Sequence, residues 1–437
     1  MKRYIPYSIL TVLLFSLITA CKKDYADPSG PSAEQAYSTP ATLAADAVGL
    51  QAWYAKDRVG LLYNTVTSAS LLCYETFVTN RGNTDEAQVG DGGTKIQNTN
   101  AVVTQMWGVS NKIRYEADSI MRRTNAIVTD KGFASGIIAY ASIFKAMAIG
   151  VQANFWEQVP ASMGRPDTVT NDVKFIPGSQ GYTLAVATLD NALNTIATTP
   201  IGSNFTPNVP STVNIINTLY ALKARYALCA GDYATALAAA DKVDLKVTSV
   251  LAFNQQITNP VFTLVTATSN IYNVADSSMG LPVGLRPDKN DQRIPFYILY
   301  QAPPKKPALL INGFFKTNVT AVPIYLPGEI TLIKAECYAR QHNLPAGLAE
   351  LNKVVTKSPS ADAFGVGAQL PPAVAATEAD LLTLIYKHRR IELFMSGQEL
   401  EDNRRFGRPQ AERGRNYFPY PFVERNDNPN TPADPAF

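Results

Sequence analysis

An internal repeat constrains the fold of this chain more than any other feature of its sequence. Residues 224–243 align without a gap on residues 335–354, at a constant offset of 111 residues. The identical pairs are Ala224/Ala335, Leu237/Leu348, Ala238/Ala349, Lys242/Lys353 and Val243/Val354. A unit of this length with helical apolar spacing predicts a helical hairpin that buries its apolar side against a neighbouring copy.

The first copy shows how the hairpin turns. We expect its first helix from about Val213 to Cys229, followed by a turn at Gly231-Asp232. Alanines dominate the second helix and allow the two helices to approach closely. Asn343 keeps a short polar side chain at the position that matches Asp232. This spacing and the Gly-Asp-Tyr turn resemble a tetratricopeptide repeat.

Two further segments extend the helical scaffold on the N-terminal side. A helix is expected from about Ser135 to Ala153, where apolar residues recur at helical spacing. It can pair with a second helix from Tyr182 to Ile196. The connection 154–181 is long for a helical hairpin, and it is either a functional surface or an insertion that covers the core.

The C-terminal half combines one clear helix with an irregular region. A capping box at Thr377-x-x-Asp380 begins a helix that we expect to end around Gly397. Residues 244–325 are rich in Thr, Asn, Pro and Tyr and have weak periodicity, which predicts loops and a few short strands. The predicted fold is therefore mostly α: helical hairpins of about 135–243 and 328–407, with an irregular, loop-rich subdomain between them.

The N-terminus has the pattern of a lipoprotein signal peptide. Lys2 and Arg3 precede an apolar run, and the run ends directly in Ile18-Thr19-Ala20-Cys21. We predict that residues 1–20 are removed and that the Cys21 thiol is acylated. Residues 21–41 are a lipidated tether rich in Pro, Ser and Ala, so the folded domain is expected over 42–437.

Charge, cysteines and histidines exclude several classes of function. The formal charge falls from +3 to +1 when Lys2 and Arg3 leave, which argues against binding to nucleic acid. Beyond Cys21 the remaining cysteines are few and widely spaced, so no disulfide framework is implied. His342 and His388 are the only histidines. We expect no His-rich zinc site and no cofactor, because no phosphate-binding loop, zinc spacing or nucleophile elbow is present.

Several ordered segments carry a resemblance to a known family. They are Trp107 with Ser119-Ile120 and Asn125; Ala139 to Pro160; Asp291 to Pro295 with Gly313 and Lys316; Leu332 to Glu336; Leu351 to Val354; Arg389 to Phe394; Arg404 to Gly407; and Phe418 to Pro421 with Glu424 and Asn428-Pro429. Together they resemble the SusD/RagB family of Bacteroidetes surface lipoproteins. Arg389 and Ser396 stand where glutamate is common, so the chain resembles a divergent member.

This resemblance implies a function in nutrient uptake. Members are lipid-anchored at the cell surface of the outer membrane, where they bind a nutrient, typically an oligosaccharide. They act as the lid and capture subunit of a TonB-dependent, SusC-like outer-membrane barrel. The expected partners are thus this barrel, a glycan or peptide ligand, and the membrane through the lipid anchor. Catalysis is not expected.

Candidate ligand contacts come from the chemistry of sugar recognition, since sugar C–H faces pack on aromatic rings and hydroxyls bind polar side chains. Exposed aromatic residues in loops are the first place to look. One group closes an early helix, a second lies in the irregular region, and the last is a loop tryptophan: Tyr74, Asn80, Arg81 and Asn83; Tyr272, Asn273 and Asp276; and Trp156. Arg389, Arg390 and Glu392 are interpreted instead as a structural ion-pair network, and His388 as a satisfied, half-buried side chain.

Two other classes of function remain open at this stage. A lipoprotein with helical repeats can be a scaffold in outer-membrane assembly, using the same hairpins and anchor. A surface glycoside hydrolase needs two carboxylates in a cleft, for example from Asp85/Glu86, Glu116/Asp118 or Glu399/Glu401/Asp402. Sequence spacing alone does not support such a pair. The aromatic loops and the C-terminal motifs favour the nutrient-binding lid.

Overall fold

The computed structural model describes residues 37–163, 172–267, 271–303 and 308–437. The expected signal peptide and Cys21 lie outside the described residues, so both remain predictions. The first described helix, α3, begins at Pro40 behind a capping box formed by Thr39 and Thr42.

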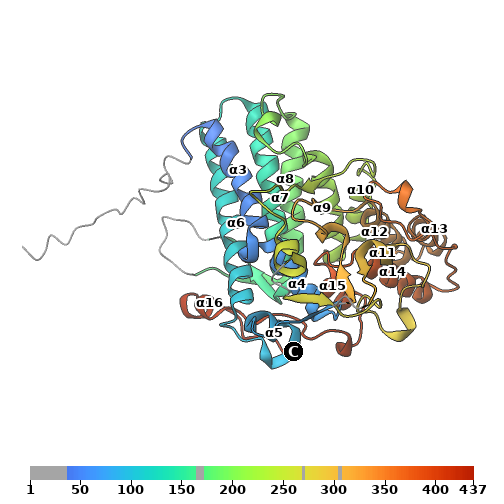
Figure 1. Ribbon diagram of the computed structural model, residues 1–437. Coiled ribbons are helices and arrows are strands. Elements are labelled where there is room, and N and C mark those ends of the chain that lie inside the picture. The colour runs from blue at the N-terminus through green and yellow to red at the C-terminus, as the bar shows by residue number, and fades with distance from the viewer. Residues whose placement is uncertain (1–36, 164–171, 268–270, 304–307) are drawn as a thin grey trace, which may run out of the picture.

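The N-terminal part of the described chain consists mainly of helices, several of them long. They are α3 (Pro40–Ala55), α4 (Leu61–Leu72), α5 (Thr84–Asp91), α6 (Ala101–Ile127), α7 (Lys131–Phe155), α8 (Gly178–Thr198), α9 (Ile215–Ala230) and α10 (Tyr233–Ala240). Polar side chains begin many of them by accepting a backbone N–H, as Asn100 does for α6 and Asp130 for α7. In Figure 1, α3, α6, α7 and α8 lie side by side.

The C-terminal part contains the second repeat copy and shorter helices. They are α11 (Arg293–Tyr297), α12 (Pro327–Arg340), α13 (Leu344–Val355), α14 (Glu378–Glu392), α15 (Glu399–Arg405) and α16 (Phe422–Asp427). The capping box at Thr377 and Asp380 is present. Helix α14 ends at Glu392 and not near Gly397, because Met395 and Gly397 both adopt positive φ angles, of 54° and 86°.

The strands of the described chain form short antiparallel pairs. The pairs are β1 (Thr76–Val78) with β5 (Tyr272–Val274), β2 (Gln158–Pro160) with β3 (Phe175–Pro177), β4 (Val250–Leu251) with β8 (Val322–Pro323), and β6 (Ile298–Tyr300) with β7 (Leu309–Ile311). The connection between α7 and α8 therefore contains the hairpin β2–β3. Each of the three remaining pairs contains at least one strand from the irregular region 244–325. This mostly helical fold with helical hairpins and few short strands confirms the fold class expected from sequence.

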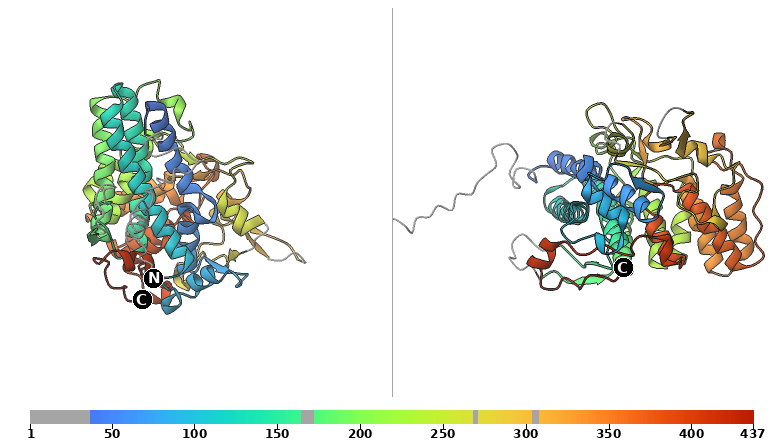
Figure 2. Two further views of the ribbon diagram at one scale, coloured as in Figure 1. Left: turned by 90° about the vertical axis from the view of Figure 1, so that its left-hand side faces the viewer. Right: turned by 60° about the horizontal axis from the view of Figure 1, so that its bottom comes forward.

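The helices form a sequential array. Helices α6, α7, α8, α9 and α10 each pack on the next, and α10 packs on α12, which contacts α13 and α14. Figures 1 and 2 show the long helices on one side of the molecule and α12 to α14 on the other. Each copy of a repeat can bury its apolar side only against a neighbour, and this order provides one for both copies.

The two repeat copies are alike in backbone conformation. Gly231 ends α9 with a φ of 81°, and His342, at the same repeat position, has a φ of 61°. Asp232 then caps α10 by accepting the N–H of Thr235, and Asn343 caps α13 in the same way. The left-handed residue lets backbone N–H groups bind the last free carbonyls of the helix, and it reverses the direction of the chain. The predicted hairpins are thus confirmed.

Helix α7 is the apolar centre of the array. It is the one described helix with the length and hydropathy of a membrane span, and 89% of its most apolar window is buried inside the protein. Gly150 allows close packing at this point, because a Cβ there would lie 2.4 Å from the ring of Tyr226 on α9. Burial of this kind identifies α7 as a core helix.

The C-terminal segment 407–437 crosses the N-terminal elements. The N–H of Gly414 donates to the carbonyl of Leu72, and the N–H of Phe418 donates to the carbonyl of Phe155. The carbonyl of Pro419 accepts the indole N–H of Trp156 at 3.0 Å. The last segment of the chain therefore completes a core that the first helices begin.

Candidate functional site

Buried ion pairs on α14 support the surface that carries several of the predicted ligand contacts. Arg293 has no exposed side-chain surface; it binds both oxygens of Asp291 and donates to Glu392 at 3.0 Å. It also donates to Nδ1 of His388 at 2.8 Å. Burial and the Arg293 guanidinium hold the pKa of His388 well below its ordinary value, so this imidazole is neutral. The structural interpretation of Glu392 and His388 is confirmed, although His388 is more buried than expected.

A second buried pair fixes the end of α4. Arg390 donates to Glu75 at 3.2 Å, and the other oxygen of Glu75 accepts the N–H of Met395 at 3.0 Å. Burial and the nearby Glu399 raise the pKa of Glu75 well above its ordinary value, and Arg390 opposes this shift. Because the side chain of Glu75 is held inward, its neighbour Tyr74 points outward, with a φ of 60°.

Two exposed aromatic side chains follow from this arrangement. Tyr74 is 43% exposed and Phe77, the middle residue of β1, is 47% exposed. Thr76 and Val78 point inward, because successive side chains of a strand alternate between its two sides. Such exposed rings offer flat apolar surfaces to a ligand.

The turn after β5, which carries Asp276, begins next to Glu75, between Tyr74 and Phe77 in the chain. The N–H of Ala275 donates to the carbonyl of Glu75 at 3.0 Å. Asp276 is exposed and accepts the N–H of Ser278. Gly280, with a φ of 69°, is required here, because a Cβ would lie 2.3 Å from the carbonyl oxygen of Cys73. We call the exposed side chains of Tyr74, Phe77 and Asp276 the β1 face.

The predicted polar loop lies at the other end of β1. Asn80 is exposed, and its side chain accepts the N–H of Gly82. Arg81 pairs with Asp91 at 2.7 Å, and the side-chain oxygen of Asn83 accepts from Arg58. These side chains are thus at the edge of the β1 face, and Arg81 and Asn83 already have protein partners.

Three predicted contacts lie in the core and do not reach the surface. Trp156 is fully buried among aromatic rings, including Trp107 at 4.9 Å between centroids. Tyr272 is buried, and its hydroxyl accepts from Tyr63. Asn273 is also buried and accepts the N–H of Val274. Pairing with β1 covers the segment of Tyr272 and Asn273, and the C-terminal segment covers Trp156, so none of the three is exposed to a ligand in this structure.

Phe77 is an exposed aromatic residue that the sequence analysis did not select as a candidate. Its neighbours are apolar or small, and β1 contains only three residues. An alternating pattern in so short a segment gives no usable signal, and the exposed position of Phe77 follows from the pairing with β5.

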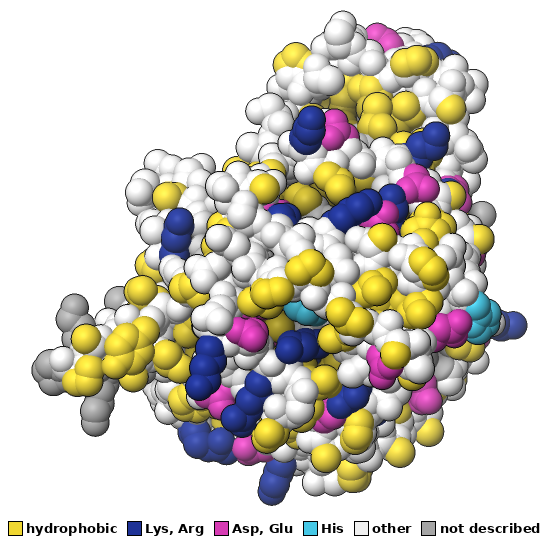
Figure 3. Space-filling model, turned by 90° about the vertical axis from the view of Figure 1, so that its right-hand side faces the viewer, with side chains coloured by type: hydrophobic (Ala, Val, Ile, Leu, Met, Phe, Trp, Pro, Cys, Tyr) yellow, Lys and Arg dark blue, Asp and Glu magenta, His cyan; other side chains and the backbone are white. Residues whose placement is uncertain are grey.

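The carboxylates considered for a hydrolase all have partners within the described chain. These contacts are Asp85 with the N–H of Ala101, Glu86 with Arg58, Glu116 with Lys112, Asp118 with Lys145, Glu399 with the N–H of Ser396, Glu401 with Arg404, and Asp402 with Arg389 and Arg405. Burial raises the pKa of Glu399 to about 7. On the face shown in Figure 3, acidic and basic side chains occur together, as expected for a near-neutral domain.

No family model matches the chain, and no curated protein matches it in sequence. Solved structures do match. A SusD-like protein from Bacteroides fragilis has a TM-score of 0.71 at 11% identity, over 93% of this chain and 99% of its own. A SusD homologue from Bacteroides thetaiotaomicron gives the same values. A SusD-like carbohydrate binding protein from Bacteroides fragilis has a TM-score of 0.70 at 14% identity, over 90% and 99% of the two chains.

The chain therefore has the same fold as these SusD-like proteins. This confirms, at the level of fold, the resemblance that the ordered motifs suggested. Many of those motif residues are members of the buried ion pairs: Asp291, Arg293, Glu336, Arg389, Arg390, Glu392, Arg404 and Arg405. These motif residues thus have a structural role in the core.

Proposed function

We propose that this protein is a cell-surface lipoprotein that binds a glycan through the β1 face. The observation that carries the proposal is the SusD fold in combination with the two exposed rings of Tyr74 and Phe77. One of the solved structures with this fold is described as a carbohydrate binding protein. Sugar rings present C–H faces that pack on aromatic side chains, and the carboxylate of Asp276 can accept hydrogen bonds from sugar hydroxyls.

Calorimetric titration of the chain from residue 22 with a panel of oligosaccharides tests this proposal. We expect saturable binding to at least one glycan, and at least a tenfold loss when Tyr74 and Phe77 are both changed to Ala. Phe422→Ala is the matched control, because Phe422 is an exposed aromatic residue on α16, outside the β1 face. An equal loss in the control, or no loss in the double variant, contradicts the assignment of the β1 face.

We propose further that the bound glycan is released unchanged. Each carboxylate named above has a cation or a backbone N–H group as a partner, which supports this part of the proposal. Incubation with the same glycans should therefore yield no product by mass spectrometry. Product formation that is abolished by Glu399→Gln or Glu401→Gln contradicts this part of the proposal.

The third part of the proposal is the partnership with a TonB-dependent, SusC-like barrel, for which the protein serves as lid and capture subunit. Acylation of Cys21 and the tether to residue 41 would keep the domain at the outer-membrane surface. Cys21→Ala should release a protein that still binds glycan but supports uptake poorly. Uptake that stays at the wild-type rate would show that the lipid anchor is dispensable, and co-purification with an assembly factor in place of a transporter would favour the scaffold function.

A further inference from the structure

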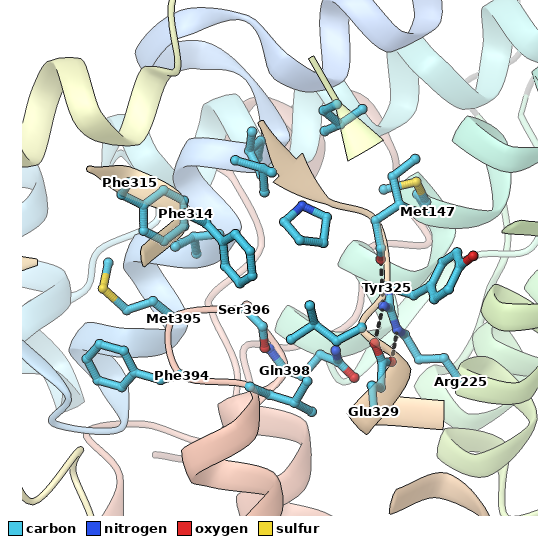
Figure 4. Close-up of a pocket in the computed structure, with 18 of the residues that line it drawn as sticks. Met147, Arg225, Phe314, Phe315, Tyr325, Glu329, Phe394, Met395, Ser396 and Gln398 are labelled. Carbon is cyan, nitrogen blue, oxygen red and sulfur yellow. Dashed lines mark hydrogen bonds and ion pairs between the residues drawn. The ribbon is translucent and has the colours of Figure 1, made fainter. Parts of the chain in front are cut away.

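A cavity inside the protein lies between the array and the irregular region (Figure 4). We call it the Gln398 cavity. Its walls are mainly apolar and aromatic, and come from α4, α7, β8, the 3₁₀ turn at Gly313–Phe315 and the turn after α14. Phe314, Pro323, Ser396 and Gln398 are half-buried and form its mouth, whereas the deeper residues Val66 and Met147 are buried.

The cavity has no net charge at its inner wall. Arg225 and Glu329 form a two-pronged ion pair, with Nε to Oε1 at 2.5 Å and Nη2 to Oε2 at 2.8 Å. The same Nη2 also donates to the carbonyl of Ile324. Figure 4 shows this pair closing one side of the space, opposite Phe314. A charged ligand would find its counter-charge already occupied.

Polar groups at the cavity lack protein partners. The side-chain amide of Gln398 makes no hydrogen bond to another group in the described chain, although it lines the cavity. The hydroxyl of Thr65, a buried residue, is likewise unpartnered within the described residues. Thr65 lines a second cavity of about 60 Å³, which shares Met147, Arg225 and Gln398 with the first. A purely apolar occupant would leave these donors and acceptors unsatisfied.

The size of the cavity limits the occupant further. Its volume is about 70 Å³. One water position needs about 10–15 Å³, and an engineered cavity that holds benzene measures about 150 Å³. A whole sugar ring is therefore too large, whereas a side group of about four non-hydrogen atoms fits.

We propose that the Gln398 cavity is a second binding site, for the acetamido group of an N-acetylated ligand. The methyl group packs against Met147 and the aromatic walls, and the amide N–H and carbonyl pair with the side-chain amide of Gln398. The extension to an N-acetylated sugar rests on the proposed glycan-binding function, because the ring would remain at the mouth beside Phe314. Recognition of the isolated acetamido group does not depend on it.

Methyl-¹³C methionine NMR of the chain from residue 22 tests the site with acetamide as the probe. Six of the seven methionines lie in this chain. Met147 and Met395 line the cavity, and Met121 and Met163 do not. Acetamide should shift the signals of Met147 and Met395 together, with a dissociation constant on the order of millimolar for so small a ligand. Acetate, its charged counterpart, should bind at least tenfold more weakly.

Variants of Gln398 test whether its amide makes the contact. Gln398→Leu keeps the volume and removes the amide, and it should weaken acetamide binding by about thirtyfold, the effect of two lost hydrogen bonds. Gln398→Phe should abolish binding by filling the mouth. Gln341→Leu, at an exposed position, is the matched control and should change nothing. Equal binding of acetate, shifts of all methionines alike, or full binding in Gln398→Leu overturns the proposal.

A last comparison separates this site from the β1 face. N-acetylglucosamine should shift Met147 and Met395, and glucose should not. Tyr74→Ala should weaken oligosaccharide binding and leave the acetamide response unchanged. An unsubstituted chain that responds to acetamide but binds no glycan contradicts the proposed function alone, and one that binds glycan without any response to acetamide contradicts this inference alone.

Discussion

The helical array from α7 to α10 and the ion-pair cluster on α14 hold the molecule together by different means. The array packs alanine and other apolar side chains, with close approaches at glycines such as Gly150. The cluster buries charges: Arg293, Arg390 and Glu392 have no exposed side-chain surface. An apolar core tolerates the exchange of one apolar side chain for another of similar volume. A buried charged side chain, in contrast, requires its oppositely charged partner. The cluster should therefore be the region more sensitive to substitution.

The largest effect is expected from Arg293→Met. The change leaves Asp291 and Glu392 buried without their shared cation, which costs about 3–5 kcal/mol of unfolding free energy. Urea unfolding of the chain from residue 22 measures it. Lys353→Met is the control, since Lys353 pairs with Glu350 at an exposed position, and a change within about 0.5 kcal/mol is expected there. Similar losses in both variants would remove the contrast between buried and exposed pairs.

The next effect is a pH dependence of stability to which Glu399, on α15 next to the cluster, contributes. Burial raises the pKa of Glu399 to about 7 in the folded protein, against an ordinary value of 4.5. The folded state then binds the proton more tightly, so this contribution to stability is complete below about pH 4.5 and is lost as the pH rises through 7. The slope is at most about 1.4 kcal/mol per pH unit. Glu399→Gln should flatten the profile of unfolding free energy between pH 5 and 8, and an unchanged slope would assign it to another group.

Substitution of two glycines in the long helices should change the unfolding free energy by an intermediate amount. Gly150→Ala places a Cβ 2.4 Å from the ring of Tyr226, so overpacking should cost about 1–3 kcal/mol. Gly108, inside α6, has no atom within 4 Å of the corresponding position. Gly108→Ala should therefore stabilise the protein by about 0.5–1 kcal/mol. Thermal and urea unfolding of both variants distinguish the effect of close packing from that of helix propensity. Stability changes of the same sign in the two variants would contradict the packing argument.

The smallest effect compares the two repeat copies. His342 occupies a left-handed conformation that glycine adopts without strain, so His342→Gly should raise the unfolding free energy by about 1 kcal/mol. Gly231→Ala, at the equivalent turn, should lower it by a similar amount, because no neighbouring atom obstructs the new methyl group. A destabilised His342→Gly protein would indicate that the contact between His342 and Glu378 matters more than the backbone.

The same contrast explains what the sequence could predict. The hairpins, their turns at Gly231 and Asp232, and the capping box at Thr377 depend on nearby residues, and a single sequence contains their signals. The β1 face depends on β1 pairing with β5, which lies almost two hundred residues later. Burial of Tyr272 follows from the same pairing.

The burial of Trp156 could not be predicted from local sequence either. Its loop position suggested exposure, yet residues near the C-terminus cover it, since Pro419 accepts its indole N–H. No local pattern contains that contact. The Gln398 cavity likewise joins segments from α4 to the turn after α14, so none of it was visible as a motif.

The C-terminal segment has a consequence for how the protein is made. Leu72, Phe155 and Trp156 make backbone or indole hydrogen bonds to residues between 414 and 419. A ribosome synthesises residues 414–419 long after the early helices, so the contacts of these helices stay incomplete until that segment has emerged. Contacts of such long sequence separation slow folding. Under the proposed export, this delay would keep the polypeptide unfolded while it is threaded across the membrane. Removal of residues 414–419 should also be as damaging as the loss of a helix.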